Sequence, residues 1–169
     1  MKYQTIVADP PWKQMGGSLK GGVGKGFVYP PGPIKSRPLP YDQMTVEAIK
    51  ALPVADLAAP DAHLYLWATN KYLPDAFGVV EAWGFTYSTT LVWAKRLMGG
   101  GLGGASRINT EFCLFARRGK LATTGTVKGT HFDWKRPYDE RGKPRHSAKP
   151  PAFMEMVEAV SPGPRLELF

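Results

Sequence analysis

Short apolar runs alternate along the chain with segments whose apolar positions recur every three or four residues. The runs are rich in β-branched and aromatic residues and predict strands at 3–8, 63–68, 85–93, 110–116 and 165–169. The segments with helical spacing predict helices at 44–52, with Thr45 as N-cap, around 73–83, and at 152–159, directly after Pro151. Strands that alternate with helices favour an α/β fold wound around a mainly parallel sheet.

The length of 169 residues indicates one domain, residues 1–169, with no internal repeat. The single cysteine, Cys113, lies in an apolar run, which favours a buried thiol and excludes an internal disulfide. No apolar run is long enough to span a membrane, and the N-terminus does not resemble a signal peptide, so we expect a cytoplasmic protein. The histidines show no metal-ligand spacing, and we expect no metal.

The positive charge is concentrated in one segment. Between Lys95 and Lys149 there are 13 Lys or Arg against 4 Asp or Glu, whereas the rest of the chain has 9 against 10. The net charge of +8 therefore resides in this segment, which favours a polyanionic partner such as nucleic acid over a scattered basic surface. Solvated basic loops are common, so charge alone does not identify the chemistry.

Several loops should meet at the carboxyl edge of the predicted sheet, where ligands bind in wound α/β folds. They are the loops 13–40 and 97–107 and the segment 146–150 that precedes the last helix. The loop 13–40 is long and rich in Gly and Pro, which indicates a lid or a substrate-gripping loop. Its glycines lack the spacing and the Ser or Thr of a phosphate-binding loop.

The tetrapeptide Asp9-Pro10-Pro11-Trp12 follows the first buried strand. Two readings account for it. In one, the prolines end the strand and Trp12 packs into the core, which does not explain the presence of the Asp9 carboxylate. In the other, the strand delivers a carboxylate and an aromatic ring to the ligand edge of the sheet.

The second reading is supported by a resemblance to the S-adenosylmethionine-dependent amino-methyltransferases. The Trp form of the motif resembles the branch typified by the catalytic subunit of the eukaryotic mRNA adenosine methyltransferase, with bacterial and phage relatives. The resemblance extends over nearly the whole chain, through the segments 64–70, 83–85, 91–95, 110–114, 146–150 and 161–169. It implies a Rossmann-like class I methyltransferase fold, with the catalytic motif N-terminal and the cofactor strand C-terminal.

The chemistry of adenine explains why these residue types suit such a site. Its exocyclic amine is a poor nucleophile because the lone pair is drawn into the ring. The Asp9 carboxylate and the Pro10 carbonyl can accept from its two N–H groups and favour a pyramidal nitrogen. Pro11 restricts the backbone of Pro10 to an extended geometry, and Trp12 can stack on the purine. Orientation supplies much of the rate, and neither a metal nor a general base is required.

The resemblance also implies roles for single residues. Lys149 matches a lysine that meets the cofactor carboxylate, Asp9 can meet the cofactor amine, and Glu167 matches an acid on the cofactor side. The residues expected at the substrate are Trp12, Asn70, Trp93, Glu111 and Arg107. Basic residues of the segment 95–149 are expected to hold the nucleic-acid backbone, namely Arg96, Arg107, Arg117, Arg118 and Lys120. For Lys149 the alternative is an exposed lysine before a helix, and for Trp67, Trp83 and Trp93 it is a place in the core.

The resemblance implies methyl transfer from S-adenosylmethionine to the N6 amine of adenine in nucleic acid, in DNA in preference to RNA. A non-catalytic nucleic-acid-binding partner subunit of the same fold is the alternative, and a homodimer or a heteromeric assembly is open. In this family a basic tail beyond the last strand binds the ribose and adenine of the cofactor, whereas the sequence here ends at Phe169. We therefore expect the chain to lack that tail and to bind the cofactor weakly or only with a partner.

Overall fold

The computed structural model describes residues 1–13, 42–95, 101–103, 106–143, 145 and 148–169, and the backbone alone for 101–107 within these ranges. The strands of the main sheet are β1 (Tyr3–Ala8), β2 (Ala58–Ala68), β3 (Thr86–Ala94), β6 (Thr110–Arg118), β7 (His131–Phe132) and β8 (Arg165–Leu168). The helices are α1 (Val46–Lys50), α2 (Val54–Leu57), η1 (Asn70–Tyr72), α3 (Leu73–Ala82) and α4 (Pro151–Val160). A separate hairpin consists of β4 (Gly101–Gly103) and β5 (Ser106–Ile108).

The six strands lie in the order β7-β3-β6-β2-β1-β8. Strand β1 pairs in parallel with both β2 and β8, and β3 pairs in parallel with β7. Strand β6 is antiparallel to both of its neighbours, β2 and β3. Within this sheet of the described residues, five strands therefore share one direction and β6 opposes them.

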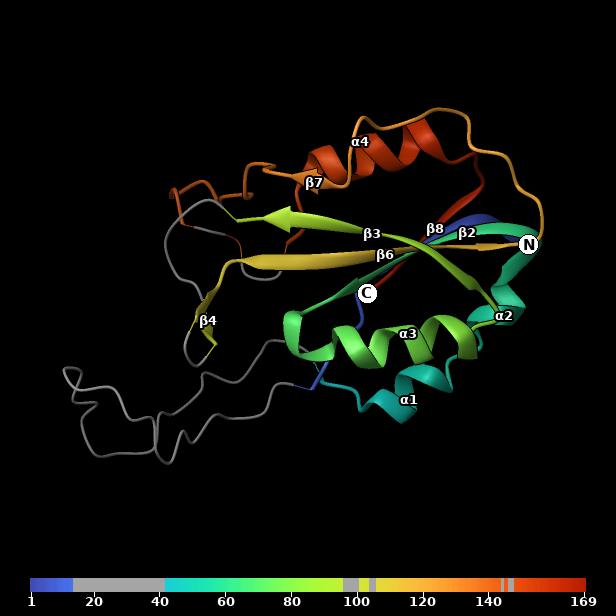
Figure 1. The fold of residues 1–169 in the computed structure, drawn as a ribbon, viewed down its shortest axis with the longest axis horizontal. Coiled ribbons are helices and arrows are strands. Elements are labelled where there is room, and N and C mark those ends of the chain that lie inside the picture. The colour runs from blue at the N-terminus through green and yellow to red at the C-terminus, as the bar shows by residue number, and fades with distance from the viewer. Residues whose placement is uncertain (14–41, 96–100, 104–105, 144, 146–147) are drawn as a thin grey trace.

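Helices cover both faces of the sheet, with α4 on one side and α1 and α3 on the other (Figure 1). Alternate side chains of β1 enter the two cores, since Ile6 packs on the side of α1 and α3 while Val7 packs on the side of α4. Both residues are at most 3% exposed. Burial on both faces explains why the strands read as nearly continuous apolar runs.

The α/β class, the wound topology, the mainly parallel sheet and the five predicted strands are confirmed, and β6 makes the sheet a mixed one. The direction of β6 follows from its connection. Parallel strands need a crossover of about a dozen or more residues, usually a helix. The sequence predicts no helix between 93 and 110, and the connection contains the β4–β5 hairpin instead. Thr45 caps α1 as predicted, accepting from the amide of Ala48 at 3.2 Å.

Candidate active site

The turn after β1 is fixed by hydrogen bonds on several sides. The amide of Asp9 donates to the carbonyl of Leu168 at the end of β8, at 3.2 Å. The Pro11 carbonyl accepts from the amide of Met44 at 2.8 Å, and the Trp12 indole donates to the Trp67 carbonyl at 3.0 Å. The two prolines limit the backbone torsions between these anchors. Asp9 therefore lies at the carboxyl edge of the sheet in a turn with little freedom.

Four charged side chains meet at this edge. Lys149, which precedes α4, lies with its ammonium 2.5 Å from the Asp9 carboxylate and 3.5 Å from the Glu111 carboxylate. Glu111, at the start of β6, also pairs with Lys95, which follows β3. The side chains of Asp9, Lys149 and Glu111 are between 18% and 29% exposed, so the cluster is only partly open to water. Sequence reasoning missed Lys95, although its position just beyond a predicted strand end was the available signal.

The pKa of the Asp9 carboxyl is raised, because burial disfavours its charge more than its neighbours favour it. Lys149 opposes the rise in pKa through its charge and its hydrogen bond, and Lys95 opposes it more weakly. Glu111 adds to the rise by repulsion. Perturbed carboxyls of this kind gather at functional sites, because the arrangement costs stability and persists where chemistry requires it.

A pocket of about 260 Å³ opens beside Asp9. Its polar lining includes Asp9, Lys149 and Glu167, and its apolar lining includes Trp67, Phe153 and Phe169. The ammonium of Lys149 lies 5.1 Å from the centre of the Trp67 ring, a cation–π contact. Trp67 is also a buried donor without a partner among the described residues, since its Nε1–H meets no acceptor there. The pocket therefore combines an anion, a cation and aromatic walls.

This donor set fits S-adenosylmethionine. A cationic group suits the carboxylate of its methionine end, an anionic group suits its amine, and aromatic walls suit its apolar atoms. The volume lies slightly below the ~300 Å³ at which ligand pockets begin, so these walls accommodate part of a cofactor-sized molecule.

Trp12 and Trp93, both predicted at the substrate, are buried in this structure. Trp12 is 4% exposed and stacks on Tyr72, with ring centres 5.2 Å apart and planes at 17°. Trp93 is 2% exposed, donates to the Trp134 carbonyl at 2.9 Å and meets Trp67 edge-on at 6.2 Å. The ammonium of Lys95 lies 4.9 Å from the centre of the Trp93 ring, so this ring borders the charged cluster. The contact of Trp12 and Trp93 with a substrate stays a prediction.

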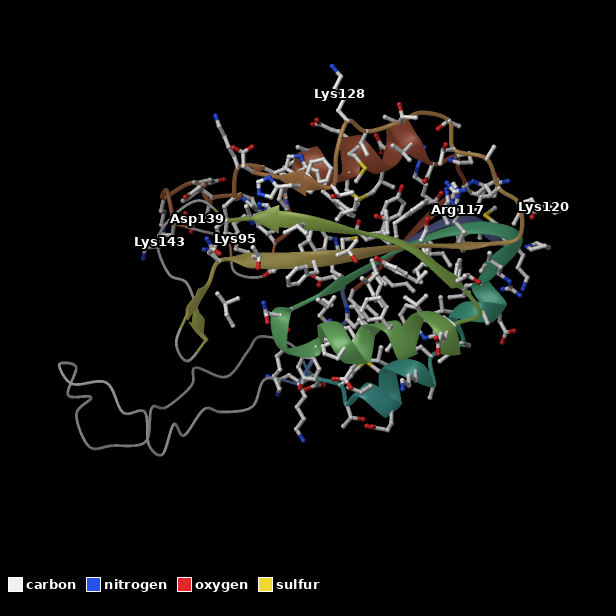
Figure 2. All side chains as sticks on the ribbon, viewed as in Figure 1. Lys95, Arg117, Lys120, Lys128, Asp139 and Lys143 are labelled. Atoms are coloured by element: carbon white, nitrogen blue, oxygen red, sulfur yellow. The ribbon has the colours of Figure 1, made fainter. Side chains whose placement is uncertain are left out.

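The remaining predicted residues divide between the two edges of the sheet. Asn70 is exposed in η1, directly beyond β2 and at the carboxyl edge. Arg117 and Lys120 lie at the opposite end of the sheet from Lys95 (Figure 2). Arg118 is next to Arg117 at the end of β6 and donates to the Ala55 carbonyl at 2.8 Å. Because β6 is antiparallel, its C-terminal residues lie at the edge of the sheet opposite the site, and the expected contact of these three basic residues with the nucleic-acid backbone stays a prediction.

Several predicted positions lie outside the described residues. They are Arg96, the side chain of Arg107, His146, Ser147 and most of the loops 13–40 and 97–107. Among the described residues, no group of His, Cys, Asp and Glu side chains is arranged to hold a metal ion. None of the described helices is both long and apolar enough to cross a membrane.

Comparison with known families assigns the chain to the S-adenosylmethionine-dependent adenine methyltransferases. The family model described as MT-A70 matches residues 3–169, so the chain belongs to the MT-A70 family of adenine methyltransferases. The chain is also similar to the Type II methyltransferase M.MunI of Mycoplasma sp. The two are 29% identical over 179 residues, which cover 99% of this chain and 72% of the relative.

Proposed function

We propose that this chain transfers a methyl group from S-adenosylmethionine to the exocyclic amine of adenine in DNA. The observation that carries the proposal is the meeting of the Asp9 carboxylate with the Lys149 ammonium beside a pocket at the carboxyl edge of β1. A carboxylate alone at a strand end has many uses. A carboxylate in a rigid turn, with a cation that suits an amino-acid zwitterion, fits methyl transfer within this family.

Asp9 and Pro10 act on the substrate amine in this proposal. Each accepts a hydrogen bond from one of its two N–H groups, which turns the nitrogen lone pair toward the methyl donor. The Pro10 carbonyl already accepts from the amide of Trp12 at 2.7 Å, and a carbonyl oxygen has a second lone pair to offer. The fixed turn holds both acceptors in place before the substrate arrives, so orientation is supplied in advance.

Lys149 and Glu167 act on the cofactor in this proposal. S-adenosylmethionine supplies an electrophilic methyl group on a sulfonium when it is bound. Lys149 binds its carboxylate and Asp9 meets its amine, and Glu167 on β8 lines the same pocket. Buried Trp67 and Phe153 exclude water from the reacting atoms, which strengthens the electrostatic interactions there.

The similarity to a Type II methyltransferase supports the choice of DNA over RNA. The target base must leave a duplex or lie in a single strand, because its amine takes part in pairing within a double helix. The charge of the segment 95–149 favours a polyanionic substrate in either case.

Methyl transfer from labelled S-adenosylmethionine to DNA and RNA oligonucleotides tests the proposal. The wild type is expected to label DNA more than RNA, and only oligonucleotides that contain adenine. Asp9→Asn keeps the shape of the side chain and is expected to lower the rate at least about 100-fold. Asp42→Asn, at an exposed position, is the matched control and is expected to retain the wild-type rate. Equal labelling by the wild type and Asp9→Asn would overturn the proposal, and preferential labelling of RNA would overturn the choice of DNA.

A further inference from the structure

The segment between β7 and α4 leaves the catalytic edge and returns to it. At its start, the Trp134 carbonyl accepts from the Trp93 indole at 2.9 Å, and the Trp134 ring packs on Phe153. At its end, Lys149 lies on the Asp9 carboxylate. The residues between these two anchors, 135–143 and 145 among those described, are called the basic turn below. Since both of its anchors belong to the site, the basic turn lies beside it.

Backbone hydrogen bonds give the basic turn a defined shape. The amide of Arg145 donates to the Pro137 carbonyl at 3.0 Å, and the amide of Asp139 donates to the Lys143 carbonyl at 2.8 Å. The Asp139 carboxylate accepts from the amides of Arg141 and Lys143, at 2.9 and 2.8 Å. Its charge is therefore engaged with the backbone of the turn itself.

The basic turn presents cations and one aromatic ring to solvent. It carries five basic side chains, Lys135, Arg136, Arg141, Lys143 and Arg145, against the two acids Asp139 and Glu140. Arg141, Lys143 and Arg145 are exposed, whereas Lys95 and Lys149 form ion pairs with the acids of the site. Tyr138 is 58% exposed and borders an open hollow of about 480 Å³ with Arg141 and Arg145.

The position of the basic turn separates it from the other basic residues. Figure 2 places Asp139 and Lys143 at the same end of the sheet as Lys95, and Arg117 and Lys120 at the other end. A strand of nucleic acid that delivers a base to Asp9 must pass this end. The basic turn is then within reach of the nucleotides next to the target.

We propose that the basic turn is a nucleic-acid contact of this protein, in which Arg141, Lys143 and Arg145 bind phosphates and the Tyr138 ring stacks on a base near the target. The inference rests on the proposed function for the identity of the ligand. An exposed aromatic ring among cations is the arrangement by which proteins hold unpaired nucleotides, since every base offers a face for stacking. The cations add an affinity that is independent of sequence and sensitive to salt.

Fluorescence anisotropy with labelled adenine-containing oligonucleotides, without cofactor, tests the inference at several salt concentrations. Arg141→Gln combined with Lys143→Gln is expected to weaken binding and to lower the salt slope by about 0.7 to 0.9 for each lost phosphate contact. Tyr138→Ala is expected to weaken binding at least about five-fold, and Tyr138→Phe to retain it, because stacking requires only the ring. Glu140→Gln removes a repulsive charge and is expected to strengthen binding.

Arg117→Gln combined with Lys120→Gln is the charge-matched control at the far edge of the sheet, and a smaller loss than in the basic turn is expected. An equal loss in the two double variants, or unchanged binding by Tyr138→Ala, would overturn the inference, as would a wild type that binds no oligonucleotide. A wild type that binds through the basic turn and transfers no methyl group would refute the proposed function alone. Methyl transfer with basic-turn variants that bind like the wild type would refute the inference alone.

Discussion

The ammonium of Lys149 lies 2.5 Å from the Asp9 carboxylate, although 140 positions separate the two residues in the sequence. The contact forms because β1 ends, at the carboxyl edge of the sheet, beside the start of α4, which Lys149 precedes by two residues. It places a cation on the acceptor that the proposed chemistry needs. In the proposed function, a cofactor carboxylate that draws Lys149 away would leave Asp9 free to accept, which would link cofactor binding to the availability of Asp9.

Lys149→Gln should weaken cofactor binding and move the pH profile of methyl transfer. The lysine charge and hydrogen bond lower the pKa of Asp9, so their loss raises that pKa further. Asp9 must be ionised to accept from the amine, and the acidic limb of the profile therefore moves to higher pH. We expect an increase in cofactor KM of about ten-fold or more, the scale of a lost charged hydrogen bond. Initial rates across pH at saturating DNA measure both effects.

Lys95→Gln is the matched control for that experiment. Lys95 has the smallest influence among the groups that set the pKa of Asp9, and it contacts Glu111 rather than Asp9. Its removal should move the acidic limb in the same direction by a smaller amount. A displacement as large as that of Lys149→Gln contradicts the assignment of Lys149 as the partner of Asp9.

Asp9→Asn should leave the protein at least as stable as the wild type while activity is lost. The pKa of Asp9 is raised in the folded state, so ionisation of this carboxyl opposes folding as pH rises above the ordinary value of 3.8. Asn does not ionise, and the variant should gain melting temperature relative to the wild type as pH increases. The gain should be small, because the side chain is 29% exposed and Lys149 partly neutralises it. Thermal unfolding at pH 5 and pH 7.5 measures it.

Glu47→Gln should change the melting temperature in the opposite direction to Asp9→Asn. The pKa of Glu47 is lowered by hydrogen bonds at the start of α1, including one with Thr45, so its ionised form favours folding. Its substitution should lower the melting temperature at pH 7.5, with a smaller loss at acidic pH.

For the earlier prediction, an Asp9→Asn variant that melts several degrees below the wild type at pH 7.5 would contradict the interpretation of Asp9 as a destabilising functional group.

The sequence predicts the elements of this fold well and their directions less well. Strand β1 ends in the apolar run Ile6-Val7-Ala8, and a proline pair follows it after Asp9, so its existence and its end are local properties. The direction of β6 is not local, because it depends on how the chain connects two strands. The available signal was that the sequence predicts no helix between 93 and 110. The resulting antiparallel direction of β6 explains why Arg117 and Lys120 lie at the far end of the sheet from Lys95.

In the site, too, some features can be predicted from the sequence and others depend on tertiary contacts. Asp9 and Lys149 belong to motifs that the family resemblance identifies, and the structure brings both to one pocket. The burial of Trp12 is different, because whether an aromatic ring faces a ligand or a core depends on its neighbours. Tyr72, the last residue of η1, stacks on the Trp12 ring. The sequence around Trp12 does not predict this contact.

The buried His63 should make the protein sensitive to mild acid. Its Nε2–H donates to the Leu121 carbonyl at 3.1 Å, and its Nδ1 accepts from the Ser161 hydroxyl at 2.8 Å, which in turn accepts from Tyr65. Burial lowers the pKa of His63 below its ordinary 6.5. The unfolded state therefore takes up a proton first as pH falls below 6.5, and stability declines there by at most about 1.4 kcal/mol per pH unit.

Urea unfolding of the wild type and His63→Gln between pH 7.5 and 5.5 checks this prediction. The free energy of unfolding of the wild type should fall more steeply with acid than that of the variant, even where the variant is less stable throughout. Burial raises the pKa of Tyr65 to about 12 against the opposing effect of its hydrogen bond with Ser161, so the wild type should also lose stability as pH rises above 10. Parallel pH curves for the two proteins below pH 6.5 would contradict the role of His63.

Gly119→Ala should destabilise the fold by more than backbone strain alone. Gly119 has φ of +67° in the turn after β6, where a side chain costs about 1 to 2 kcal/mol. A Cβ there would overlap the Asp61 carboxylate and lie 2.7 Å from the Pro60 carbonyl oxygen. It would also displace Asp61 from the amide of Lys120, which donates to it at 2.6 Å. Gly84→Ala isolates the strain, since Gly84 has φ of +77° and open space around it. We expect Gly119→Ala to lose about 1 to 3 kcal/mol more than Gly84→Ala in urea unfolding, the range for a disrupted hydrogen bond, and equal losses would contradict the steric argument.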